Sequence, residues 1–161
     1  LVVDPVMIAT SGSRLLEPSA EQELVCPLLP RATVVTPNIP EAVVLSGMNI
    51  STLEEMRESA LQIMELGPQY VLIKGGHLEG SDVTDILVGP SSEWVLSGPR
   101  YPYPVHGSGC CFSAAITAYM ALGCSVPEAF RKAKEFINRA IGDAVVSSSG
   151  RYSVNPRQGG E

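Results

Sequence analysis

The chain has 161 residues, of which 45% are hydrophobic and 17% charged, and its formal net charge is −6. This length and composition are sufficient for one domain with a substantial core. The acidic balance argues against a broad nucleic-acid surface, and no apolar run is long enough to cross a bilayer. None of the four cysteines forms a C-x-x-C pair, which disfavours a disulfide scaffold or structural zinc site and favours a cytoplasmic protein.

Apolar strands and helices alternate along the chain. Buried strands are expected at residues 1–3, in ATVVTPN from Ala32 and in YVLIKGG from Tyr70, and the shorter VTDILVG and EWVLSG are expected to pair as a hairpin. Helices are expected over residues 20–29, 40–47, 53–66, 110–122 and 127–146, the first capped by Ser19 and the third by Thr52. Because LVVDPVM begins as a strand without a methionine or polar lead-in, we expect the chain to be part of a longer polypeptide.

This alternation predicts an α/β fold, with a mainly parallel sheet flanked by helices on both faces. Residues 1–146 are expected to form the folded portion and residues 147–161 a loose C-terminal tail. In such folds ligands gather at the carboxyl ends of the strands. The chemically interesting segments follow strands in this way: Asp4, Asn38, residues 74–77 and the loop at 106–110.

The segment HGSGCCFSAAI, from His106, places a flexible loop before a helix. Gly107 and Gly109 allow main-chain N–H groups to face one point, where the helix adds its positive dipole end. Cys110 lies in the first helical turn, where its pKa is expected to fall, so that it can take a proton or attack an electrophile. The opposing interpretation, equally open, is that the glycines permit close packing and the cysteines fill space. Cys111, Cys26 and Cys124 are expected in the core.

Two common phosphate motifs are excluded. The chain has no G-x-x-x-x-G-K-[ST] sequence, so it is not a P-loop protein. A cysteine-dependent phosphatase needs an arginine shortly after its nucleophile, and the residues from Cys111 to Thr117 include none.

The other strand-end groups each have two interpretations. Asn38 and Glu41 provide oxygens that could order water on Mg²⁺, or they simply begin a helix. Lys74 ends a buried strand, where it could contact a phosphate or extend to solvent at the sheet edge. Asp4 could neutralise Lys74, lie near a metal, or bond its own backbone in a turn.

Four segments, VVDPVMIATSGSRLL, VVTPNIPEA, VLIKGGH and HGSGCCFSAAI, stand in an order and spacing that resemble one enzyme family. The chain resembles the C-terminal, larger portion of hydroxymethylpyrimidine/phosphomethylpyrimidine kinases, which belong to the ribokinase-like superfamily and serve thiamine biosynthesis. The resemblance extends from Leu1 to about Val146. It implies a ribokinase-like fold that is incomplete at the N-terminus, where the family's early strands and pyrimidine-binding region are absent.

The resemblance also implies roles for particular residues. Cys110 would act as the base, at a position where most ribokinase-like enzymes have aspartate. The implied binding groups are the N–H groups of Gly107, Ser108 and Gly109 for the transferred phosphoryl group, Lys74 and Asp4 for ATP phosphates, and Asn38 and Glu41 for Mg²⁺ through water. The chain departs from the family's usual threonines at Ser108 and Cys111.

The implied function is ATP- and Mg²⁺-dependent phosphorylation of hydroxymethylpyrimidine and its monophosphate. A pyridoxal-type vitamin kinase and a noncatalytic nucleotide-binding fragment are the alternatives. The expected partners are therefore a small pyrimidine and ATP, with the adenine against the last two helices, and neither nucleic acid nor membrane. An open sheet edge also suggests a homo-oligomer or pairing with the missing N-terminal portion.

Overall fold

The computed structural model describes residues 1–8, 14–78 and 80–157. Its main sheet has five strands in the order β1-β2-β3-β4-β5. Their bounds are Val2–Val3, Val34–Val35, Tyr70–Ile73, Asp82–Val88 and Glu93–Pro99. The first three strands are parallel, whereas β4 is antiparallel to both β3 and β5. The sheet is therefore mixed, and the predicted hairpin is the β4–β5 pair.

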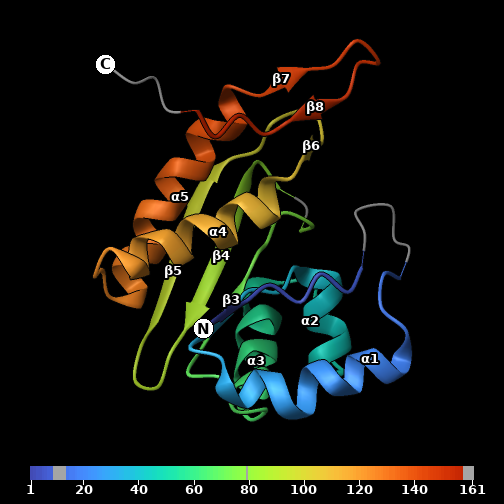
Figure 1. Cartoon of the computed structure of the whole chain (residues 1–161), viewed down its shortest axis with the longest axis vertical. Coiled ribbons are helices and arrows are strands. Elements are labelled where there is room, and N and C mark those ends of the chain that lie inside the picture. The colour runs from blue at the N-terminus through green and yellow to red at the C-terminus, as the bar shows by residue number, and fades with distance from the viewer. Residues whose placement is uncertain (9–13, 79, 158–161) are drawn as a thin grey trace.

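Helices cover both faces of this sheet (Figure 1). On one face lie α2 (Ile39–Ser46) and α3 (Leu53–Met64), with α1 (Pro18–Glu23) nearby, and on the other lie α4 (Ser108–Ala121) and α5 (Val126–Gly142). The predicted α/β class and its two helical layers are confirmed. No helix in the described ranges is long and apolar enough to cross a bilayer.

Alternation along the strands explains why both faces are buried. Val35, Val71 and Ile73 belong to the core on the α2–α3 side, and Val34 and Leu72 belong to the core on the α4–α5 side. Successive side chains of a strand point to opposite faces, so a continuous apolar run supplies both cores at once.

Two helices, the first and the last, differ most from the prediction. The first helix begins at Pro18 rather than after Ser19, and its α-helical part ends at Glu23. A π-helical turn containing Pro27 and then a 3₁₀ turn carry the chain on to Arg31. Proline has no N–H and its ring displaces the carbonyl one turn earlier, which accounts for the departure from regular α-helix here.

The last helix ends at Gly142, not near Val146, because residues 145–146 form a strand instead. This strand, β7, belongs to a second, three-stranded sheet with β6 (Val105–His106) and β8 (Tyr152–Ser153). Part of the segment expected to be a loose tail is thus paired with the loop before α4. Tyr152 stacks on Tyr103 with the ring centres 4.0 Å apart, which anchors this segment.

Candidate active site

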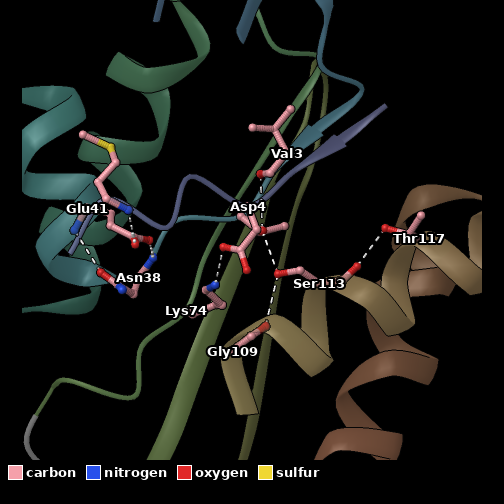
Figure 2. A network of polar contacts seen from close by, with 10 residues as sticks. Val3, Asp4, Asn38, Glu41, Lys74, Gly109, Ser113 and Thr117 are labelled. Atoms are coloured by element: carbon pink, nitrogen blue, oxygen red, sulfur yellow. Dashed lines mark hydrogen bonds and ion pairs between the residues drawn. The ribbon is translucent and has the colours of Figure 1, made fainter. Parts of the chain in front are cut away.

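The residues that follow the three parallel strands meet at one edge of the sheet (Figure 2). Nζ of Lys74, after β3, lies 2.9 Å from Oδ1 of Asp4, after β1, and the two side chains are 12% and 16% exposed. Asn38, after β2, forms an isolated parallel bridge with Lys74. Parallel strands end at the same edge, so residues as distant in sequence as 4 and 74 become neighbours.

The first turn of α4 offers main-chain N–H groups. Gly107 adopts a left-handed conformation with φ of 81°, and the N–H of Cys111 donates to its carbonyl over 2.9 Å. The N–H groups of Ser108, Gly109 and Cys110 precede this helical hydrogen bond and have no partner within the helix. The N-cap residue, Gly107, has no side chain with which to cap these groups, and the Ser108 hydroxyl donates to Val105 O. The helix dipole makes this end favourable for an anion.

The lysine and the helix start face the same space. A Cβ atom built on Gly109 would lie 3.5 Å from Nζ of Lys74. We call Lys74 Nζ together with the N–H groups of Ser108, Gly109 and Cys110 the Lys74–α4 site. An ammonium group and the positive end of a helix converge there, which is an arrangement suited to a phosphate.

Cys110 is exposed and its thiol is free, so the residue does not fill the apolar core. The expected fall in its pKa is wrong. Partial burial of the sulfur raises the pKa of Cys110, and the charge of the Asp4 carboxylate raises it further, while Lys74 opposes them. Cys111 instead packs against the α4–α5 core, as predicted, whereas Cys26 is exposed, contrary to the prediction.

Asn38 and Glu41 form the start of α2. Oδ1 of Asn38 accepts from the Glu41 N–H, and Oε2 of Glu41 accepts from the Asn38 N–H, each over 2.9 Å. The other Glu41 oxygen accepts from the N–H of Met7 over 3.0 Å, and Glu41 is only 2% exposed. Each oxygen thus accepts one main-chain N–H, so Glu41 caps the start of α2 and holds the chain at Met7, while its role in ordering water on Mg²⁺ stays a prediction. Within the described ranges, no group of three His, Cys, Asp or Glu side chains could hold a metal ion directly.

A groove adjoins the Lys74–α4 site. Its volume is about 470 Å³, and it extends from Gly76 and Ser108 along the segment 99–105 to Ile141 of α5. Tyr101 and Tyr103 contribute aromatic rings to its wall. The groove thus reaches the Lys74–α4 site at Ser108 and has apolar and aromatic residues along its length, which suits a ligand with a flat ring and an anionic group.

Comparison with known proteins decides the family. The family model for phosphomethylpyrimidine kinase matches residues 1–155, nearly the whole chain. The chain belongs to the phosphomethylpyrimidine kinase family.

Proteins similar to this chain are named for different substrates. The chain is 40% identical over 157 residues to the hydroxymethylpyrimidine/phosphomethylpyrimidine kinase of Bacillus subtilis, covering 96% of this chain and 58% of the relative. It is 44% identical over 144 residues to the pyridoxine kinase of the same organism, covering 88% of this chain and 53% of that one. The chain thus spans little more than half the length of these relatives.

Solved structures share the fold over the same portion. The pyridoxal kinase from Staphylococcus aureus in complex with AMP-PCP and pyridoxal superposes with a TM-score of 0.86 at 37% identity. The match covers 96% of this chain and 56% of the kinase. The predicted ribokinase-like fold is therefore confirmed, over the portion of the family's fold that this chain contains.

The sequence analysis missed a buried ion pair of this chain, which supports the Lys74–α4 site. Lys134, in α5, is 5% exposed. Its Nζ lies 2.8 Å from Oδ2 of Asp85, whose Oδ1 accepts from the N–H of Gly75 over 2.8 Å. Lys134 shares the buried face formed by Phe130, Ala133 and Ile137, and that i, i+3, i+4 spacing was the signal available in the sequence.

Arg100 was also missed. Its guanidinium donates to the carbonyl oxygens of Gly76, Leu78 and Gly80. These contacts shape the loop that follows Lys74 and lines one side of the groove. The sequence carried no signal for them, because main-chain carbonyls leave no residue-type pattern.

Proposed function

We propose that this chain carries the phosphoryl-transfer centre of an ATP-dependent kinase acting on hydroxymethylpyrimidine and its monophosphate. The observation that carries this proposal is the convergence on one space of Lys74 and the first-turn amides of α4, which precede its first helical hydrogen bond, with the Cys110 thiol exposed beside it. Phosphoryl transfer depends mainly on positioning and charge stabilisation, and this arrangement supplies both.

In this proposal the N–H groups at Gly107, Ser108 and Gly109, with that of Cys110, hold the transferred phosphoryl group. They are fixed by the helix and need no reorganisation as negative charge develops. Lys74 contacts the nucleotide phosphates. Asp4 directs Lys74 toward the site through their 2.9 Å ion pair.

Cys110 is the proposed acceptor of the proton from the substrate hydroxyl. Its raised pKa means that the thiolate is the minor form at neutral pH. A loose transition state requires little proton removal before the new P–O bond forms, so a minor thiolate fraction is compatible with turnover. The turnover number should then increase with pH on the alkaline side.

ATP is the proposed phosphoryl donor, with its base in the groove near Tyr101 and Ile141. The groove's continuity with Ser108 supports this placement, as does the binding of AMP-PCP by the Staphylococcus aureus kinase. Mg²⁺ would accompany the phosphates and neutralise part of their charge. Asp4 is the better placed oxygen donor for it, because Glu41 already binds main-chain N–H groups.

A pyridoxal-type kinase is the second candidate, because a pyridoxine kinase is 44% identical to this chain. The two activities share their phosphoryl-transfer chemistry and differ in the acceptor alcohol.

The chain spans little more than half of its relatives, so we propose that further residues complete the acceptor pocket, from the same polypeptide or from a partner copy. Free thiols at all four cysteines are in keeping with action in the cytoplasm.

The test is coupled ATP turnover by the natural full-length protein, with hydroxymethylpyrimidine and pyridoxal in competition. We expect Cys110→Ala to lower the turnover number by about 100-fold, as for loss of a general base. Cys110→Asp should retain turnover and lose the alkaline increase, since aspartate is already ionised at neutral pH. Cys111→Ala is the matched control and should change little.

Each alternative has its own outcome in this experiment. Preference for pyridoxal would favour the second candidate. ATP binding without turnover on either alcohol would favour a noncatalytic nucleotide-binding protein. Unchanged turnover in Cys110→Ala would overturn the assignment of Cys110 as proton acceptor.

A further inference from the structure

Two buried hydroxyl groups connect the end of β2 to the first turn of α4. Oγ1 of Thr36 lies 2.8 Å from Oγ of Ser113, although 77 residues separate them in the sequence. Thr36 is fully buried and Ser113 is 5% exposed. Each hydroxyl has one further contact, from Thr36 to Val3 O at 3.4 Å and from Ser113 to Gly109 O at 3.2 Å. Figure 2 shows Ser113 between the strand end at Val3 and the helix start at Gly109.

The distances give this small network a direction. Two hydroxyl protons serve three contacts, so one contact must lack a proton at any moment. Both contacts with carbonyl oxygens are longer than the usual 2.7–2.8 Å of an O–H···O bond, and that of Thr36 with Val3 O, at 3.4 Å, is the longer of the two. The favoured arrangement therefore has Thr36 donating to Ser113 and Ser113 donating to the carbonyl of Gly109.

That carbonyl belongs to a peptide group of the Lys74–α4 site. The oxygen of Gly109 and the N–H of Cys110 are parts of one planar unit and point in opposite directions. A hydrogen bond that holds the oxygen therefore also fixes the direction of the N–H. The same peptide unit lies beside Nζ of Lys74, because a Cβ on Gly109 would contact it.

Ordinary helix chemistry accounts for only part of this arrangement. Serine and threonine in helices commonly donate to the carbonyl four residues earlier. Thr117 does so on the same helix, with its hydroxyl 2.9 Å from Ser113 O. Ser113 differs because its hydroxyl also binds Thr36, so that α4 is joined to the sheet in a low-dielectric interior, where such a bond is strong.

We propose that Thr36 and Ser113 are positioning residues for the Lys74–α4 site. They fix the Gly109–Cys110 peptide relative to the strand ends, so that its N–H and Lys74 contact one anion together. The consequence for turnover rests on the proposed kinase function, but the consequence for anion binding does not.

Anion binding can be measured with inorganic pyrophosphate and the natural full-length protein. The readout is the ¹⁵N–¹H signals of Ser108, Gly109 and Cys110. In the wild type these signals should move on titration. Thr36→Val and Ser113→Ala should each weaken binding by about fivefold to tenfold, the worth of one buried hydrogen bond, and the double variant should be little weaker than either because the two hydroxyls act as a unit.

Two matched variants separate positioning from general stability. Thr36→Ser keeps the hydroxyl and should bind within about twofold of the wild type, whereas Thr36→Val keeps the shape and loses the hydroxyl. Thr117→Val removes the same kind of i−4 bond without touching the sheet and should also stay within about twofold. Thermal unfolding shows whether each variant is folded. If Thr36→Val is not folded, pyrophosphate binding by Ser113→Ala still tests the proposal on its own.

Kinase kinetics give the second readout. Thr36→Val and Ser113→Ala should lower kcat by about tenfold while the KM of the acceptor alcohol changes little. If wild-type protein shows no turnover but pyrophosphate binding follows the expected pattern, the kinase proposal fails and the positioning role stands. Binding by Ser113→Ala equal to that of the wild type, or no response of the three amides to pyrophosphate, would overturn the positioning role.

Discussion

Nζ of Lys134 in α5 lies 2.8 Å from Oδ2 of Asp85 in β4, and both side chains are almost completely buried. The pair closes the α4–α5 layer over the sheet. Through its second oxygen, Asp85 also holds the amide of Gly75, the residue directly after Lys74. A buried ion pair thus connects the packing of α5 with the position of Lys74, the proposed phosphate-binding lysine.

Removing the positive partner should be costly. Lys134→Met leaves the Asp85 carboxylate buried without a counter-charge, and we expect about 3–5 kcal/mol less unfolding free energy at neutral pH. Burial already raises the pKa of Asp85 and Lys134 lowers it, so the variant's carboxyl should bind a proton more tightly when folded. The loss of unfolding free energy in Lys134→Met relative to the wild type should therefore be smaller at acidic pH and larger as the pH rises.

Urea unfolding of wild type and variant between acidic and neutral pH measures this effect. Arg131→Met is the matched control on the same helix. Its ion pair with Glu135 is more than half exposed on both sides, so a change within about 0.5 kcal/mol is expected. A Lys134→Met deficit that is small, or that does not depend on pH, would contradict the role given to the pair.

Substitution of Glu41 tests whether its buried carboxylate stabilises the fold or orders a metal ion. Glu41→Gln places an amide N–H against a main-chain donor of Asn38 or Met7, and we expect a loss of about 1–3 kcal/mol in unfolding free energy. The loss should be the same in EDTA and in Mg²⁺. A loss that appears only with Mg²⁺ present would instead support the metal-ordering role predicted from the sequence.

An exposed capping residue provides the comparison for Glu41. Oε2 of Glu55 accepts from the Ser51 hydroxyl and from the N–H groups of Ser51 and Thr52 at the start of α3, and these bonds, that of the Ser51 hydroxyl first, lower the pKa of Glu55. Because water can replace these bonds, Glu55→Gln should destabilise the protein less than Glu41→Gln.

The charges around Cys110 should control its reactivity. Asp4 raises the pKa of the Cys110 thiol and Lys74 lowers it, so Asp4→Asn should increase the thiolate fraction at a given pH and Lys74→Met should decrease it. Alkylation by iodoacetamide, followed by mass spectrometry of the Cys110 peptide, should therefore accelerate in the first variant and slow in the second. The exposed Cys26 serves as an internal reference. Equal rates in the two variants would show that Asp4 and Lys74 do not act on this thiol.

The two glycines of the loop should respond differently to alanine. Gly107 needs a positive φ of 81°, so Gly107→Ala should cost about 1–2 kcal/mol of stability. Gly109 has room for a methyl group at ordinary contact distance from Nζ of Lys74, so Gly109→Ala should fold with a stability within about 1 kcal/mol of wild type. Its methyl group would separate Lys74 from a bound phosphate.

Nucleotide affinity distinguishes these two variants. For Gly109→Ala we expect ATP to bind at least about tenfold more weakly, the equivalent of one charge-assisted hydrogen bond. Isothermal titration with ATP, beside urea unfolding, measures both quantities. Unchanged affinity in Gly109→Ala would argue against phosphate contact at the Lys74–α4 site.

Patterns that depend on neighbouring residues in the chain were readable from the sequence. The apolar runs of β1, β2 and β3, the hairpin, and the start of α3 at Thr52 all follow from side-chain alternation and local capping. The order of the strand-end segments also placed Asp4, Asn38, Lys74 and the loop before α4 at one edge of the sheet. Family resemblance added the roles proposed for them.

Only the tertiary structure decided how those groups interact. The helix position of Cys110 predicted a lower pKa, but burial and Asp4, 106 residues earlier in the chain, raise it instead. The charges of Lys134 and Asp85 are buried because they meet each other, and Thr36 joins Ser113 across 77 residues. Local sequence sets backbone preference and the faces of helices and strands. The electrostatic environment of a side chain depends instead on which distant groups the fold brings within a few ångströms, and on how much water it excludes.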